Sequence, residues 1–277
     1  MMTMKSKPLP KLVRLLLTLA TACLLVAPTQ AATPKKVLVV SVTKGFRHSS
    51  IPTAEKILGD LGKKSGAFTV DYARTDQDIA EKMTADALKQ YDGVIFANTT
   101  GDLPLPDRQA FIDWVKSGKA FAGMHSASDT FHGFPPYIEM LGGEFQTHHA
   151  QVRVDCRNHD PKHPATRSLG ATFTVFDEIY LQKNFHRDQV HVLLALDAHP
   201  NDKTPGFYPI SWCKEFGKGR VFYTALGHRE DMWDTDTPEK FKRENSKEVS
   251  QAYQDHILGG IKWALGLEKG DATPQTK

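Results

Sequence analysis

The chain has 277 residues, of which 24% are charged, and its formal net charge is +3 at pH 7. Four basic residues near the amino terminus account for that excess, so the rest of the chain is close to neutral. A chain of this kind offers no basic face to a nucleic acid and no charged patch to a membrane surface, which argues against both as partners. The length that remains after an exported leader, about 245 residues, suits one large domain better than two.

The amino terminus has the pattern of a cleaved secretory signal. Basic residues between Lys5 and Arg14 precede an apolar run at 15–27 that is too short to span a bilayer, and cleavage after Ala31 would leave Thr29 and Ala31 at the small-residue positions. Cys23 lies inside the apolar run instead of ending it, which disfavours a lipid anchor. We therefore expect residues 1–31 to be removed, and the protein to be periplasmic or secreted, with no membrane attachment afterwards.

The first half of the mature chain alternates strand and helix patterns. A continuous apolar run of strand length, typical of a parallel strand buried on both faces, occurs at 37–42, and further strands are expected at 68–73, 93–97 and 120–123. Helical patterns separate them, beginning after Ser49 or Ser50 and spanning 85–89 and 106–117, with Gly118 ending the last. This alternation predicts a three-layer α/β fold with a mostly parallel, flavodoxin-like central sheet.

The second half has strand patterns with few helices between them. These strands are expected at 150–155, 173–175, 190–196, 208–212 and 221–225, and a closing helix is expected at 247–265. Such a run predicts an antiparallel β extension of the parallel sheet. We expect a single domain at 36–266 and a polar tail at 267–277.

A candidate reactive residue follows the fourth expected strand. The segment 120–130 reads AFAGMHSASDT, and its apolar run stops at Gly123, where small residues permit a sharp turn from a strand into a helix. This is the shape of a nucleophile elbow, whose tip residue is held over the end of the sheet. The tip is His125, with Ser126 beside it. The alternative is a strand-to-loop junction with a structural histidine.

Several other histidines share a strand-end or glycine-turn context with this one. The set is His48, His125, His148, His149 and His228. Parallel sheets place their sites at the carboxyl ends of strands, so His48 and His125 are expected on the same rim. Imidazoles exchange protons near neutral pH and ligate metals, so this set predicts a reactive pocket.

The remaining titratable residues leave alternatives open. Glu178 lies in an aromatic-rich segment and fits either a site carboxylate or a solvated turn, while Asp129 and Asp231 would each orient an imidazole or cap a helix. Cys156 and Cys213 could form a disulfide in an exported protein or remain separate buried thiols. Surface positions are expected for the histidines among polar or helical residues: His159, His163, His191, His199 and His256.

Six sequence blocks, taken in order, resemble the ThuA-like family, named for a trehalose-utilisation protein, whose fold is related to class I glutamine amidotransferases. The resemblance covers about residues 36–266. The blocks are Gly45–His48, Gly123–His125 with Asp129–Thr130, Gly142–Gly143 with His148, Asp177–Tyr180, Pro209–Trp212 and Gly217–His228.

The resemblance also shows a difference at the elbow. Glutamine amidotransferases carry a cysteine there and a His-x-Glu pair after a later strand, whereas this chain has His125 and the triplet His228-Arg229-Glu230. Without the thiol, cysteine-based amide hydrolysis is excluded. Two facing imidazoles with a carboxylate favour proton transfer or metal ligation.

The resemblance implies work on carbohydrates, particularly oxidised sugars in which a ring hydroxyl has become a ketone, by isomerisation or eliminative cleavage. Such chemistry needs a base and a cation that holds the enediolate charge, which histidines and a divalent metal supply. We therefore expect zinc or manganese, no nucleotide cofactor, a small carbohydrate as substrate, and a monomer or a homo-oligomer.

The expected residues fall into three overlapping groups. Catalytic roles are expected for His125, His228, Glu230, Asp129 and Glu178; substrate contacts for Arg47, His48, Ser126, Tyr180 and Trp233; and metal ligation for His48, His125, His148 and His228. Two other hypotheses stay open. One is a hydrolase with Ser126 as nucleophile and His228 as base, and the other is a non-catalytic sugar-binding accessory protein, because fold does not fix function.

Overall fold

The computed structural model describes residues 1–4, 33–237 and 240–275. Residues 5–31 of the expected signal lie outside these ranges, so that expectation stays a prediction. Residues 34–277 form a compact unit of their own. Among the described residues, no helix combines the length and the apolar character that a membrane crossing requires.

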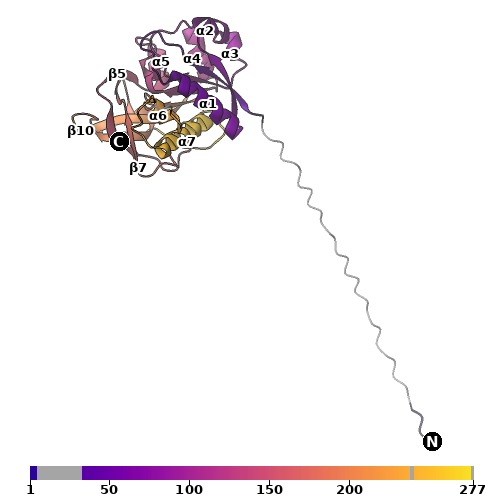
Figure 1. The fold of residues 1–277 in the computed structure, drawn as a ribbon. Helices are drawn as coiled ribbons and strands as arrows, with labels where there is room; N and C mark the ends of the chain where they lie inside the picture. The colour runs from indigo at the N-terminus through magenta and orange to yellow at the C-terminus, as the bar shows by residue number, and fades with distance from the viewer. Residues whose placement is uncertain (5–32, 238–239, 276–277) are drawn as a thin grey trace. The chain divides into compact units, whose positions relative to one another are not determined.

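A sheet of nine strands forms the centre of this unit, in the order β2-β1-β3-β4-β11-β10-β9-β6-β7. Figure 1 shows the ribbon of this unit. The first five strands in that order run parallel, and the other four continue the sheet antiparallel. This confirms the expected fold class. The bounds are β1 Lys35–Val40, β2 Phe68–Ala73, β3 Gly93–Ala97, β4 Ala120–Met124, β6 Val152–Asn158, β7 Thr172–Asp177, β9 His191–Ala198, β10 Pro205–Phe216 and β11 Gly219–Thr224.

Helices cover both faces because side chains alternate along each strand. Val37 and Val39 belong to a core shared with α1 and α7, whereas Leu38 and Val40 belong to the opposite core, shared with α2 to α5. The helix bounds are α1 Ile51–Ser65, α2 Asp76–Lys82, α3 Ala85–Leu88, α4 Arg108–Lys116, α5 Pro135–Leu141, α6 Glu230–Trp233 and α7 Lys247–Ala264, with 3₁₀ turns η1 His125–Asp129 and η2 Arg187–Gln189.

Helix α7 approaches the sheet more closely than side chains would permit. A Cβ atom on Gly259 would lie 2.0 Å from the Pro164 carbonyl oxygen, and one on Gly260 would lie 2.5 Å from the Phe222 ring of β11. Because real Cβ atoms do not come that close, both positions require glycine. The main chain of α7 therefore packs directly against its neighbours.

Several elements differ from the sequence expectation. The two-stranded sheet of β5 (Glu144–His148) and β8 (Tyr180–Lys183) was not expected, because these strands are short and largely polar. Helix α1 begins where expected, but Ser50 does not cap it with its side chain; the Ser50 hydroxyl donates to the Gly227 carbonyl instead. Cys156 and Cys213 are free and buried, which is the second of the two alternatives.

The expected surface positions are wrong for three histidines. His163, His191 and His256 are buried, with exposed fractions of 1%, 5% and 0%. Folded neighbours bind a ring nitrogen of each: His256 Nδ1 lies 2.8 Å from the Ala165 carbonyl, and His191 Nε2 lies 3.0 Å from Asp160 Oδ2. The polar residues that flank these histidines in the sequence therefore do not indicate that the imidazoles are exposed to water.

Burial of His256 is expected to make the fold sensitive to acid. Burial lowers the pKa of His256 from its usual 6.5 to about 4. Between those values the unfolded chain binds a proton that the folded chain does not, so stability falls as the pH falls through this window, by at most about 3 kcal/mol. Urea unfolding from pH 7 to pH 4.5 should show a weaker pH dependence for His256→Gln than for wild type. The exposed variant His149→Gln should match wild type, and identical slopes for all three proteins would refute this assignment.

Candidate metal centre

The ends of three parallel strands bring three histidines together. His125 begins η1 directly after β4, His48 lies in the loop after β1, and His228 follows β11. These strands lie in the same half of the sheet and point the same way, so their carboxyl ends share one edge. Glu178 reaches this edge from the short link between β7 and β8.

The four side chains converge on a small volume. One ligand atom from each of them lies within 4.8 Å of all the others. His125 Nε2 lies 3.2 Å from His48 Nε2 and 3.7 Å from Glu178 Oε1, and His228 Nδ1 lies 3.3 Å from the same carboxylate oxygen. Three imidazoles and one carboxylate are a donor set that suits a divalent transition metal.

Hydrogen bonds behind the cluster direct the lone pairs inward. His125 Nδ1 lies 2.8 Å from the Ala225 carbonyl, which can only accept, so this nitrogen carries the proton and Nε2 is free to bind. His48 Nδ1 lies 3.4 Å from the Ser126 hydroxyl on the far side of the ring. Metal-binding histidines are typically held in this way through their second nitrogen.

His228 supplies the clearest sign that the group fits a metal. Its Nδ1 is buried and makes no hydrogen bond of good geometry to any described residue, although Glu178 Oε1 is 3.3 Å away. A buried polar atom without a partner is rare in native proteins. A cation between the ring and the carboxylate would satisfy both, so the residues present fit a divalent metal.

The protonation states of His125 and His48 agree with this interpretation. Burial lowers the pKa of His125 well below its usual value, and the neighbouring His48 and His228 lower it further. Burial, and then His228, lower the pKa of His48 to about 4. Both rings are therefore neutral at pH 7, the form that ligates metals. Burial alone would lower the pKa of His228, but Glu178 and Asp177 outweigh it and raise this pKa, so a metal would have to displace a proton there.

The elbow is present as backbone geometry. His125 has a left-handed φ of 48°, which is strained for any residue with a Cβ atom. The Tyr223 hydroxyl donates to the His125 carbonyl over 2.6 Å, and the Tyr137 hydroxyl donates to the Ala127 carbonyl over 2.8 Å. These buried bonds hold the strained turn in place, so the imidazole at its tip is preorganised.

A cavity of about 290 Å³ opens above the cluster. Phe145 and Tyr180 form an aromatic wall, with ring centroids 4.3 Å apart, and Phe46 stands at the mouth with 67% of its surface exposed. His148 Nδ1 lies 3.1 Å from Glu178 Oε2, beside the four converging ligand atoms and not among them. The lining residues are Phe46, His48, Asp129, Phe145, His148, Glu178, Tyr180 and His228.

The structure does not bring four of the expected residues to this cavity. Trp233 is fully buried and donates to the Gly227 carbonyl, and the exposed Arg47 donates to the Ser41 carbonyl. Ser126 is buried beside His48. Glu230 is buried without a hydrogen bond or ion pair to His228 among the described residues, and Glu178 occupies the place expected for it.

Sequence reasoning did not single out three residues near the site: Phe46, Phe145 and His132. Phe46 could have been noticed because it lies inside the block Gly45–His48. Phe145 belongs to a strand that was not expected. His132 lies three residues after Asp129 and binds its carboxylate, with His132 Nε2 2.6 Å from Asp129 Oδ1. Asp129 thus orients an imidazole, but not that of His125.

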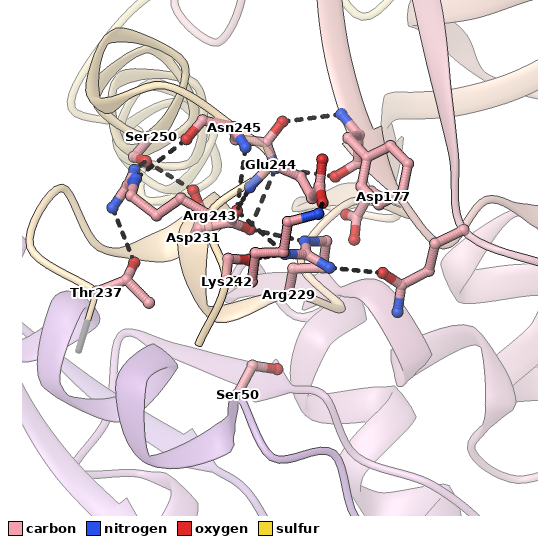
Figure 2. A network of polar contacts seen from close by, with 12 residues as sticks. Ser50, Asp177, Arg229, Asp231, Thr237, Lys242, Arg243, Glu244, Asn245 and Ser250 are labelled. Atoms are coloured by element: carbon pink, nitrogen blue, oxygen red, sulfur yellow. Dashed lines mark hydrogen bonds and ion pairs between the residues drawn. The ribbon is translucent and has the colours of Figure 1, made fainter. Parts of the chain in front are cut away.

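Asp231 has a structural place beside the site, in the network that Figure 2 shows. Its carboxylate accepts from the Arg229 guanidinium over 2.8 and 3.2 Å and from the backbone N–H groups of Glu244 and Asn245 over 2.6 and 3.0 Å. These contacts fasten the chain that directly follows His228 to the segment before α7. Asp231 therefore neither faces an imidazole nor caps a helix.

Fold and site together define an α/β protein with a glutamine-amidotransferase-like arrangement whose elbow carries a histidine in a candidate metal centre. The chain belongs to the ThuA family, described by trehalose utilisation, and the match covers residues 36–264. This family membership supports a carbohydrate-related role. No curated protein matches the sequence.

Solved structures show the same fold. A putative ThuA-like protein from Bacteroides uniformis is 22% identical, with a TM-score of 0.65, over 86% of this chain and 95% of that one. Another from Parabacteroides merdae is 17% identical, with a TM-score of 0.64, over 84% and 90%. At these identities the likeness concerns the fold alone.

Proposed function

We propose that the chain is an exported enzyme that uses a divalent metal, zinc or manganese, to remove a proton from an oxidised sugar such as a 3-keto-disaccharide. The reaction would be an isomerisation or the eliminative cleavage of a glycoside. The observation that carries the proposal is the convergence of His48, His125, His228 and Glu178 beneath a cavity with aromatic walls. Aromatic rings suit the C–H face of a sugar, and the polar floor suits its oxygens.

The residues have distinct tasks in this proposal. His48, His125, His228 and Glu178 would hold the metal, which supplies Lewis-acid stabilisation of negative charge on a substrate oxygen. His148 lies outside these four, is 44% exposed and pairs with Glu178, so it is the imidazole available for proton transfer. It would take the proton from the carbon beside the ketone, while the C–H electrons pass to the carbonyl oxygen as an enediolate.

The other two hypotheses are less well supported. Ser126 has no exposed surface and does not line the cavity. Its hydroxyl lies 3.4 Å from His48 Nδ1, whereas a hydrolase with His228 as base would need it beside His228. Both observations weigh against a serine hydrolase. Binding of a sugar without catalysis does not require the converging lone pairs of three histidines and Glu178, or a histidine held in a strained turn. Turnover separates this last hypothesis from an enzyme.

The test is metal analysis of the purified protein, combined with turnover of 3-keto-trehalose by wild type and His125→Ala. We expect bound divalent metal in wild type and loss of activity with a chelator. The rate of the variant should be lower than that of wild type by a factor of at least about a hundred. His149→Ala, an exposed histidine outside the cluster, is the matched control and should retain metal and rate. No bound metal together with equal rates for wild type and His125→Ala would contradict the proposal.

A further inference from the structure

A charged bridge beside the metal centre joins the elbow to the two-stranded sheet. His132 Nε2 lies 2.6 Å from Asp129 Oδ1, and His132 Nδ1 lies 2.5 Å from Glu144 Oε1. A neutral imidazole has only one N–H, so donation to both carboxylates requires the doubly protonated cation. Burial alone would lower the pKa of His132, but the hydrogen bonds to Asp129 and Glu144 outweigh it and raise this pKa.

The far end of the bridge is itself anchored. Glu144 begins β5 and is buried, with 4% of its surface exposed. It accepts from Asn184 Nδ2 over 2.6 Å and lies 3.3 Å from Lys183 Nζ at the end of β8. The bridge thus fastens η1 to the β5–β8 sheet, which carries Phe145, His148 and Tyr180 of the cavity wall.

The near end of the bridge faces the cavity. Asp129 lines the cavity, and 26% of its side chain is exposed. One carboxylate oxygen, Oδ1, is fixed by His132, and Oδ2 makes no hydrogen bond to the other described residues. A carboxylate held in one orientation with a free oxygen is a strong acceptor for hydroxyl groups.

We propose that Asp129 binds a hydroxyl group of the sugar and sets the specificity of the cavity, and that His132 is its positioning residue. This inference rests on the proposed function for the class of ligand, a saccharide, but not for the reaction. The aromatic wall would contact the apolar face of the sugar ring, and Asp129 would accept a hydrogen bond from a hydroxyl group at the edge of that ring. His132 acts through Asp129 and does not touch the ligand.

The test uses binding, so that no reaction is needed. Trehalose and its mono-deoxy analogues are titrated calorimetrically into metal-loaded wild type and Asp129→Asn. We expect trehalose to bind at least tenfold more weakly to the variant. One mono-deoxy analogue should bind wild type more weakly than trehalose does, by a similar factor. The same analogue and trehalose should bind Asp129→Asn equally, because the hydroxyl that is missing is the one from which Asp129 accepts. Equal losses for every analogue in both proteins, or no saccharide binding by wild type, would overturn the inference.

The positioning role has its own measurements. His132→Ala should weaken trehalose binding as Asp129→Asn does, and the double variant should be no weaker than either. The exposed variant His186→Ala is the matched control. In ¹⁵N spectra of wild type, both His132 ring nitrogens should be protonated at pH 7.5, and Glu144→Gln should remove this signature. Additive losses, or a neutral His132 ring in wild type, would overturn the positioning role. Intact binding results without keto-sugar turnover would overturn the proposed reaction and leave this inference in place.

Discussion

Glu178→Gln is expected to reduce turnover of a 3-keto-disaccharide by about a thousandfold and to weaken metal binding severely. Glu178 is the carboxylate shared by the cluster, since Oε1 lies 3.3 Å from His228 Nδ1 and Oε2 lies 3.1 Å from His148 Nδ1. The substitution keeps the shape of the side chain but removes its charge. The three imidazoles would then share a cation without the anion that compensates it.

The matched control is Glu230→Gln, which alters a second buried carboxylate on the same side of the fold. Glu230 has no ion pair to His228 among the described residues, so the expected loss of turnover is less than about tenfold. Metal content and turnover of both variants measure the difference directly. If Glu230→Gln lost metal and Glu178→Gln kept it, the carboxylate of the site would be the one in the His-x-Glu triplet.

Asp231→Ala is expected to destabilise the fold by about 3 to 5 kcal/mol. The side chain is 1% exposed and gathers the Arg229 guanidinium, two backbone N–H groups and the Asn245 amide. Alanine would leave these donors buried without an acceptor, which costs more than the pair itself contributes. The loss should be seen as a lower free energy of unfolding in urea at pH 7.

The pH dependence gives a second measurement of the same contact. Burial alone would raise the pKa of Asp231, but hydrogen bonds from Arg229, Glu244 and Asn245 outweigh it and lower this pKa. The contribution is therefore fully present above the ordinary aspartate pKa and is lost as the pH falls through the lowered value. Asp231→Ala should show less of this acid loss than wild type. Asp188→Ala, an exposed aspartate, is the control, and a loss below about 1 kcal/mol for Asp231→Ala would contradict the structural role.

The inner strands of the parallel half could be predicted from their apolar sequence. The run 93–97 is apolar throughout and fully buried, and its bounds agree with β3. The edge strand β2 also has the expected bounds, 68–73, although only Phe68 and Ala73 in it are buried. The parallel topology also predicts that His48 and His125 share one edge of the sheet. The β5–β8 sheet was not predicted because its strands are short, largely polar and partly exposed.

The choice between the two carboxylates could not be made from sequence. Glu230 follows His228 by two residues and matches a known triplet, whereas Glu178 reaches the cluster only through the pairing of β6, β7 and β9. Long-range strand pairing of this kind leaves no local pattern. The buried His163 and His256 were misplaced for a similar reason, since their partners come from distant segments.

The two glycines of α7 have a consequence for how this site tolerates sequence change. Because Gly260 meets the Phe222 ring directly, the spacing between helix and β11 is set by the main chain of α7 and by that one ring. A larger residue at Gly260 would push α7 away from β11, the strand that leads to His228. Gly259 and Gly260 therefore have almost no freedom to vary, although neither contributes a side chain to the site.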